Sequence, residues 1–457
     1  MTAQWSKDSI FYHIYPLGLC GAPQKNDFNA PAVHRLEALY SWLDHIQSLG
    51  ANALYLGPVF QSSSHGYDTV DYFQIDRRLG DNDFFARFAD TIHQSGIRLI
   101  LDGVFNHVGR DFWAFKDVLV HGQNSAYVDW FHNLRFGESS PQGDPFQYEG
   151  WHGHYSLVKL NLAHPNVRDH LFNAVGMWMD QFGIDGLRLD AADCIDFDFL
   201  RELNKFTKSR RSDFWLMGEV VHGDYREWVN PETLDSVTNY ECYKGLYSSL
   251  VDTNYFEIAY SLKRQFGEDG LYRNLWLYNF VDNHDVDRVA SKLNNPALLY
   301  PLYLLLFTMP GIPSIYYGSE WGVEGMKAQW TDAPLRPSLD LNQMRVQSPQ
   351  PDLANVIQRL GHLRSASKAL KYGDYQELHV DHQQFAFIRK FEDEVVVVIL
   401  NSASESVEVE LSLPWHGTLI DRLNPDATFQ VNGSVVCPTL PPAWGRVLSF
   451  DEIKKDL

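Results

Sequence analysis

Short runs of apolar and β-branched residues recur along the chain, and each is followed by a longer segment with helical spacing. The helical patterns include residues 33–49 and 167–182. Eight strand-then-helix units are the signature of a (β/α)8 TIM barrel, in which active sites lie at the carboxyl ends of the strands. We therefore predict an α/β fold built on such a barrel. The expected strands span residues 10–15, 53–56, 98–105, 186–190, 214–220, 237–240, 277–281 and 313–317.

The connection between the third and fourth predicted strands is too long for a barrel repeat. Asp102 and Arg188 are 86 positions apart, whereas one repeat takes about 30 residues. Residues 107–164 are rich in aromatic residues, glycine and proline. We predict that they form an inserted domain B, which emerges at the catalytic face and supplies a cleft wall. The catalytic barrel, domain A, then comprises residues 1–106 and 165–373.

The hydrophobic period changes near residue 374. Before this point, residues 353–363 carry apolar side chains at helical spacing; after it, apolar and polar residues alternate between positions 407 and 413. Such alternation is typical of a half-buried strand in an antiparallel sheet. The run VVVVIL at residues 395–400 indicates a more central strand. We predict that residues 374–457 form a C-terminal antiparallel β-sandwich, domain C.

Composition narrows the class of partner. The 457 residues are 45% hydrophobic and carry a formal net charge of −20, which disfavours nucleic acid and anionic membranes. There is neither an apolar run of membrane-spanning length nor a signal-type apolar segment near the start, so we expect a soluble, cytoplasmic protein. The four cysteines form no CxxC pair and indicate neither a zinc knuckle nor a disulfide framework. No pattern specifies an oligomeric state.

Ionisable side chains follow five of the eight predicted strands. A single histidine or aspartate at a strand end commonly caps a helix or binds a loop backbone. Five strands that end in this way, all toward one opening of a barrel, indicate a site instead. The residues concerned are His65, Tyr67, Asp68 and Asp71 after the second strand, Asp102, Asn106 and His107 after the third, Arg188 and Asp190 at the fourth, Glu219 at the fifth, and His284 and Asp285 at the seventh.

Several carboxylates beside an arginine suit a reaction with a cationic transition state. Glycoside hydrolysis needs one carboxylic acid to protonate the leaving oxygen and one carboxylate on the opposite side to attack or to activate water. The fourth and fifth strands are neighbours, so they can place Asp190 and Glu219 on facing walls. A separation of about 5 to 5.5 Å between the two carboxyl groups would make the mechanism a retaining one.

The segments DGVFNH, GLRLDAAD, GEV and FVDNHD occur in this order, together with SHGYDTVDY and GIPSIYYGSEWG. They resemble the motifs of the α-amylase family, glycoside hydrolase family 13, over residues 9–321. The resemblance implies that Asp190 is the nucleophile, Glu219 the acid/base and Asp285 the transition-state stabiliser. It further implies a substrate-binding set: His107 and His284 bonded to the sugar, Tyr67 stacked beneath it, Arg188 keeping Asp190 ionised, and Arg288, Asp332 and Arg336 farther out, where salt bridging is an equal explanation.

The segment LVKLN at residues 157–161 is similar to MPKLN of the neopullulanase, cyclomaltodextrinase and maltogenic amylase group. We therefore expect a retaining hydrolase for α-1,4 bonds of maltooligosaccharides, cyclodextrins or related α-glucans, with transglycosylation beside hydrolysis. An α-glucosidase or a 4-α-glucanotransferase on the same fold is the alternative, and a non-catalytic glycan- or partner-binding member is a remote one. Three departures weaken the likeness: we expect no room before the first strand for that group's amino-terminal β-domain, Val221 stands where a tryptophan is expected, and Ala192 and Asp193 stand where many α-amylases have Lys-His.

No cofactor is expected. Ala192 and Asp193 stand where many family members have Lys-His, a pair tied to calcium, so the motif does not support a structural calcium site and leaves Asn106 as a candidate ligand. An asparagine at a strand end is more often a helix cap or loop tie. The pair His152 and His154 lies in the predicted inserted domain, where a loop or substrate-contacting role is favoured over a metal site.

Overall fold

Eight parallel strands form a barrel in the computed structural model, which describes residues 3–329, 331–424, 427–431 and 435–451. The strand order is β13-β12-β11-β5-β2-β1-β15-β14, and a parallel bridge between Thr238 and Tyr278 joins the two outermost strands. All eight predicted strands are confirmed, with ends shifted by a few residues. They are β1 (Phe11–Ile14), β2 (Ala53–Leu56), β5 (Arg98–Gly103), β11 (Gly186–Leu189), β12 (Trp215–Gly218), β13 (Ser236–Val237), β14 (Tyr278–Asn279) and β15 (Ile312–Tyr316).

The strands are apolar on both faces because both faces are buried. Side chains such as Phe11, Ile100 and Trp215 fill the barrel interior. The alternate residues, among them Leu187 and Leu189, pack outward in the larger core cluster. Since side chains alternate along a strand, Arg188 must point to the interior between its two outward leucines.

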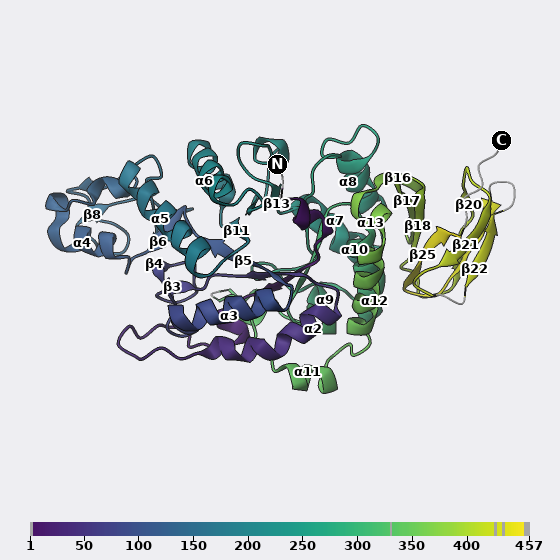
Figure 1. Ribbon diagram of the computed structural model, residues 1–457, viewed down its shortest axis with the longest axis horizontal. Helices are drawn as coiled ribbons and strands as arrows, with labels where there is room; N and C mark the ends of the chain where they lie inside the picture. The colour runs from purple at the N-terminus through teal and green to yellow at the C-terminus, as the bar shows by residue number, and fades with distance from the viewer. Residues whose placement is uncertain (1–2, 330, 425–426, 432–434, 452–457) are drawn as a thin grey trace.

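Helices surround the barrel (Figure 1). The prediction for residues 167–182 matches a long helix, whereas residues 33–49 form a 3-10 helix that continues into a short α-helix. The connection after the fifth strand differs from the expected repeat. Between β12 and β13 it contains the 3-10 turn η6 (Tyr225–Glu227) in place of an α-helix. The helices are η1 (Gln4–Asp8), α1 (Pro16–Leu19), η2 (Arg35–Trp42), α2 (Leu43–Ser48), α3 (Asn82–Gln94), α5 (Pro165–Gln181), α6 (Phe197–Arg210), α7 (Tyr240–Val251), α8 (Phe256–Phe266), α9 (Val289–Lys292), η7 (Pro296–Leu298), α10 (Leu299–Thr308), η8 (Ser319–Trp321), η9 (Ala333–Leu335), α11 (Leu341–Gln347), α12 (Leu353–Ala366) and α13 (Lys368–Tyr372).

Side-chain caps fix where two of these helices begin. Asp81 accepts a hydrogen bond from the backbone N–H of Phe84 at the start of α3, and Asp196 accepts from Asp198 and Phe199 at the start of α6. Such caps satisfy backbone donors that the first turn of a helix leaves free. Both helices then present apolar faces to the barrel.

The long connection after β5 folds into small elements of its own and lies at the far end of the molecule from the C-terminal sheet (Figure 1). A three-stranded sheet in the order β6-β10-β9 carries His107 and Trp151 on its two outer strands, and the two rings contact one another. A hairpin of β3 (Phe60–Ser62) and β4 (Thr69–Ile75) lies beside it. The elements are β6 (His107–Gly109), α4 (Trp113–His121), η3 (Gly122–Asn124), η4 (Val128–Trp130), β7 (Arg135–Phe136), β8 (Phe146–Gln147), β9 (Gly150–Trp151) and β10 (His154–Lys159).

An antiparallel sheet follows the last barrel helices, as the change of period predicts. The run at residues 395–400 lies in β18, which pairs with β17 on one side and β25 on the other. The alternating segment 407–413 forms two short strands that cover a second apolar core with the main sheet. The six-stranded sheet comprises β16 (Asp374–Val380), β17 (Gln384–Phe391), β18 (Glu394–Asn401), β25 (Trp444–Phe450), β21 (Gly417–Asp421) and β22 (Thr428–Val431). Two separate two-stranded sheets pair β19 (Val407–Glu408) with β24 (Thr439–Leu440) and β20 (Leu411–Ser412) with β23 (Val435–Val436).

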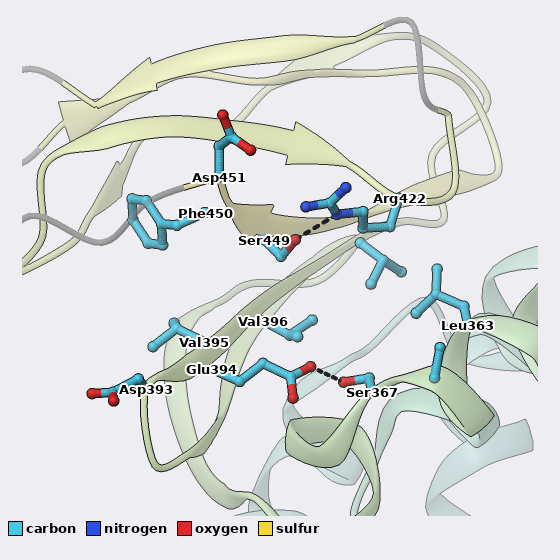
Figure 2. Close-up of a pocket in the computed structure, with 12 residues that line it drawn as sticks. Leu363, Ser367, Asp393, Glu394, Val395, Val396, Arg422, Ser449, Phe450 and Asp451 are labelled. Atoms are coloured by element: carbon cyan, nitrogen blue, oxygen red, sulfur yellow. Dashed lines mark hydrogen bonds between the residues drawn. The ribbon is translucent and has the colours of Figure 1, made fainter.

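A cavity of about 800 Å³ lies between this sheet and the helices α12 and α13 (Figure 2). Ser367 donates to Glu394 across its floor, and Arg422 donates to Ser449 on the opposite wall. None of the strand-end residues predicted as a site lines this cavity. The chemistry therefore has to be sought at the mouth of the barrel.

Candidate active site

Arg188 is the centre of a buried carboxylate cluster at the mouth of the barrel. The register of β11 on β5 places Arg188 opposite Asp102, and Nη1 donates to both oxygens of Asp102, at 2.9 and 3.1 Å. The same Nη1 lies 2.9 Å from Oδ1 of Asp190, while Nη2 lies 2.7 Å from Oε2 of Glu219. One guanidinium therefore holds three carboxylates from three adjacent strands, as its planar fork of donors allows.

Glu219 is further held by the backbone of the neighbouring loop. Ala191 adopts the left-handed conformation at φ 45°, which is strained for a residue with a side chain. Its N–H donates to Oε2 of Glu219 over 3.1 Å. Gly218 permits this close approach, because a Cβ there would lie 2.8 Å from the Cβ of Ala192. The two loops after β11 and β12 are thus fitted to one another at this point.

Asp285 completes the set of carboxylates from the loop after β14. Its Oδ2 lies 2.8 Å from Nε2 of His284, and its Oδ1 accepts from Nη2 of Arg336 over 2.7 Å. Burial raises the pKa of Asp285, but His284, Arg336 and Arg188 outweigh that effect and hold it well below its ordinary value. Asp285 is therefore the firmly ionised carboxylate of the site.

The pKa of Asp190 is shifted in the opposite direction to that of Asp285. Burial raises the pKa of the Asp190 carboxyl well above its ordinary value; Arg188 opposes the shift, and Glu219 and Asp102 reinforce it. Arg188 favours the charged form, but its charge is divided among three carboxylates and does not offset burial, so its role in keeping Asp190 ionised stays a prediction. The cluster around Arg188 consequently takes up a proton more readily than an isolated aspartate would.

Tyr67 and His284 form one stacked pair beside the cluster. Their rings are nearly parallel, with centroids 5.3 Å apart, and the Tyr67 hydroxyl contacts Nε2 of His284. The hydroxyl also lies 3.0 Å from Asp102. Tyr67 and His284 therefore lie side by side at the barrel mouth, and their roles as sugar contacts stay a prediction.

His107 lies on the other side of Asp190. Its Nε2 is 3.8 Å from Oδ2 of Asp190 and has no hydrogen-bond partner among the described residues. Burial, with His65 adding to it, lowers the pKa of His107 to about 3, so the imidazole is neutral near pH 7. Its ring packs against Trp151 of the inserted segment, with centroids 5.5 Å apart. A neutral ring nitrogen is thus free to bond a hydroxyl group beside Asp190.

The three outer candidates divide into two cases. Arg336 reaches the site: it donates to Asp285 and to the carbonyl of His284, and it pairs with Asp332 over 3.2 Å. Arg288 does not reach it. Its side chain is fully buried and donates to the carbonyls of Leu335 and Tyr317. The prediction of Arg288 as a substrate contact is corrected, because a guanidinium buried among carbonyls ties loops together.

Tyr240 is a site residue that sequence reasoning missed. It stands at the end of the sixth predicted strand, and its hydroxyl lies 3.3 Å from Oε1 of Glu219. Tyr55 was also missed and donates to Asp102 over 2.9 Å. The only feature of the sequence that could have indicated these residues is their location on predicted strands. A tyrosine carries no charge and is as common in a hydrophobic core as in a site.

The other candidates serve local structure in the described chain. The amide of Asn106 contacts the ring of His107, and His152 lies 3.7 Å from the sulfur of Cys194. Across the residues that the structure describes, no group of three His, Cys, Asp or Glu side chains is arranged to hold a metal ion. No helix in the same residues is long and apolar enough to cross a membrane.

Comparison with known proteins agrees with this geometry. Residues 26–352 match the family model described as the alpha amylase catalytic domain, and residues 375–444 match that of the maltogenic amylase C-terminal domain. The chain is 32% identical to a cyclomaltodextrinase from a Bacillus species, over 87% of this chain and 73% of that protein. It is also 32% identical to neopullulanase 2 of Thermoactinomyces vulgaris, over 98% of this chain and 78% of that protein.

Comparison with a solved structure agrees with the sequence comparisons. A cyclomaltodextrinase superposes with a TM-score of 0.88 at 29% identity, covering 99% of this chain and 79% of that chain. The family model covers most of the barrel, including every strand end that carries the carboxylates. The chain therefore belongs to the α-amylase family of glycoside hydrolases, glycoside hydrolase family 13.

Proposed function

We propose that the chain hydrolyses α-1,4-glucosidic bonds of maltooligosaccharides, cyclodextrins or related α-glucans with retention of configuration. The observation that carries the proposal is the attachment of Asp190 and Glu219 to the two terminal nitrogens of one guanidinium, Arg188. This arrangement holds two carboxyl groups beside each other at the mouth of a barrel, as a reaction with an acid and a nucleophile requires. The similarity to cyclomaltodextrinase and neopullulanase sequences supports this substrate class.

The first step forms a covalent glycosyl-enzyme. An oxygen of Asp190 attacks the anomeric carbon, the bond from that carbon to the glycosidic oxygen breaks, and Glu219 gives its proton to the departing oxygen. Positive charge develops on the sugar ring in the transition state. The ionised Asp285, held by His284 and Arg336, stabilises that charge without itself reacting.

The second step releases the sugar. Glu219, now a carboxylate, takes a proton from water, and the water oxygen attacks the anomeric carbon while its bond to Asp190 breaks. If the hydroxyl of another sugar takes the place of water, the product is a longer glucan. Transglycosylation is thus the side reaction we expect, and an α-glucosidase or a 4-α-glucanotransferase is the alternative in which chain-end binding or transfer prevails.

The deciding experiment is a time course of products from maltotriose, maltohexaose, β-cyclodextrin and pullulan, with Asp190→Asn as the inactive reference. Opening of β-cyclodextrin supports the proposal and excludes an enzyme that acts only on chain ends. Products longer than the substrate measure transfer. Near-normal turnover by Asp190→Asn would overturn the assignment of the nucleophile.

A further inference from the structure

The hydroxyl of Tyr240 faces one oxygen of Glu219, and the other oxygen is already occupied. Oε2 of Glu219 accepts from Nη2 of Arg188 over 2.7 Å and from the N–H of Ala191 over 3.1 Å. Both partners are donors only, so a proton on Glu219 cannot sit on Oε2 without facing another hydrogen. Oε1 lies 3.3 Å from the Tyr240 hydroxyl, and a hydroxyl can accept as well as donate, so Oε1 is the oxygen that can carry the proton needed for catalysis.

The direction of the Tyr240 hydroxyl is fixed by Asn283. The backbone N–H of Asp285 donates to Oδ1 of Asn283 over 2.8 Å, and because an N–H cannot accept, the orientation of the Asn283 amide is determined. Its Nδ2 then points to the Tyr240 oxygen, 3.3 Å away. The Tyr240 oxygen accepts this bond, which leaves its own proton to be donated to Oε1 while Glu219 is a carboxylate.

The setting of Tyr240 keeps that arrangement in place. Its ring packs edge-on against Phe280, with centroids 5.0 Å apart, at the first turn of α7 directly after β13. Burial raises the pKa of Tyr240 well above its ordinary value, and the charges of Glu219 and Asp285 add to the shift. The hydroxyl therefore stays protonated and acts as a donor across the working range of the enzyme.

We propose that Tyr240 is a positioning residue for the acid/base, and that the chain Asn283 to Tyr240 to Glu219 selects Oε1 as the oxygen that carries and returns the proton. The inference rests on the proposed function, since it assigns Glu219 the role of acid/base. The hydrogen bond from Tyr240 holds one oxygen of the Glu219 carboxylate during the second step. It also stops the carboxyl group from rotating away from the glycosidic oxygen.

The test compares Tyr240→Phe with the unchanged enzyme on two substrates, maltohexaose and α-maltosyl fluoride. Departure of a sugar from maltohexaose needs a proton, whereas fluoride leaves as an anion and needs none. We expect kcat/KM for maltohexaose to fall about tenfold. For α-maltosyl fluoride we expect kcat/KM within about twofold of the unchanged enzyme.

Two further variants make the result decisive. Tyr243→Phe is the matched control, because it removes a hydroxyl one turn along α7 from a ring that packs on the same Phe280; both substrates should be unaffected. Glu219→Gln tests the acid/base itself and should lose about 10²- to 10⁴-fold on maltohexaose but little on the fluoride. If Glu219→Gln shows that contrast while Tyr240→Phe loses activity equally on both substrates, or on neither, the inference about Tyr240 is wrong. If Glu219→Gln shows no contrast, the proposed function fails instead.

Discussion

Arg188 and Asp190 are two positions apart in the sequence and are joined by a 2.9 Å contact between Nη1 and Oδ1. Alternation along β11 puts both side chains on the interior side of the barrel, between leucines that face the helices. What the sequence alone leaves open is that Asp102 and Glu219 share the same guanidinium. Arg188 is therefore a tie between strands as well as a partner for one carboxylate.

Arg188→Lys should be severely impaired, although charge is conserved. A single ammonium cannot donate to three carboxylates in the plane that the guanidinium occupies, so Asp190 and Glu219 lose their relative placement. We expect kcat/KM on maltohexaose to fall by at least about 100-fold. Arg98→Lys is the matched control, since Arg98 lies at the opposite end of a neighbouring barrel strand and pairs with Asp185. Comparable losses in both variants would contradict a specific role for Arg188.

Asp190→Asn should stabilise the fold while it abolishes turnover. The raised pKa of Asp190 means that the folded state binds a proton there more tightly than the unfolded state, so the charged form costs stability above the ordinary pKa of an aspartate, about 3.9. We expect the free energy of unfolding at pH 7 to rise by about 0.5 to 2 kcal/mol.

The expected gain in the free energy of unfolding of Asp190→Asn depends on pH. The gain should shrink as pH falls below the raised pKa and should vanish near pH 4, where the native carboxyl is protonated as well. Thermal unfolding from pH 4 to 8 measures it, with Asp193→Asn, an exposed neighbour, as the control. A lower Tm for Asp190→Asn at pH 7 would show that Arg188 outweighs burial and the neighbouring carboxylates.

The barrel could be predicted because each strand is an apolar run bounded by a change of period, and periodicity depends on local residues alone. The ends of the strands could be predicted less well. The sequence predicts one helix over residues 33–49, where the structure has η2 and α2, and it predicts a helix between β12 and β13, where the structure has only η6. Both differences arise because the type of helix depends on tertiary packing. The inserted segment and the C-terminal sheet were indicated by length and by period.

The candidate site could be predicted where its residues are charged. Asp190, Glu219 and Asp285 are costly to bury without a partner, so their presence at strand ends is informative. Tyr240 was missed because a buried tyrosine is common in hydrophobic cores and needs no charged partner. Arg288 was placed wrongly for the converse reason: an arginine near a motif suggests a ligand, whereas its carbonyl partners at Leu335 and Tyr317 come from distant loops that only the fold brings together.

Arg336→Met should narrow the activity range on the acid side. His284 and Arg336 hold the pKa of Asp285 well below its ordinary value, and removal of the Arg336 charge lets that pKa rise. In the proposed mechanism Asp285 must be ionised to stabilise the cationic transition state. Titration of Asp190 affects both proteins alike, so the ratio of kcat/KM in the variant to kcat/KM in the unchanged enzyme should fall as pH is lowered, while the alkaline limb stays in place. Lys327→Met removes a cation that pairs with Asp332 and not with Asp285, and it should leave the acid limb unchanged. If this ratio does not change with pH in Arg336→Met, His284 alone sets the charge of Asp285.

Arg389→Met should weaken the attachment of the C-terminal sheet to the barrel without touching the chemistry. Arg389 lies in β17, fully buried, and its Nη1 donates over 2.7 Å to the carbonyl of Thr308 at the end of α10, while Nη2 donates over 2.8 Å to Gly373. The last carbonyls of a helix have no partner within the helix, so this arginine acts as a cap from another part of the fold.

Methionine has a similar length but leaves both carbonyls unpaired in a buried place, at a cost of about 1 to 3 kcal/mol each. We expect the free energy of unfolding to fall by about 2 to 4 kcal/mol, measured by denaturant titration, with kcat/KM at 25 °C unchanged. Lys390→Met is the control on the next, exposed residue of the same strand and should cost less than about 0.5 kcal/mol. Because Arg389 belongs to the sheet and Thr308 to a barrel helix, a loss confined to the sheet alone, with the barrel unfolding at its original midpoint, would contradict the capping role.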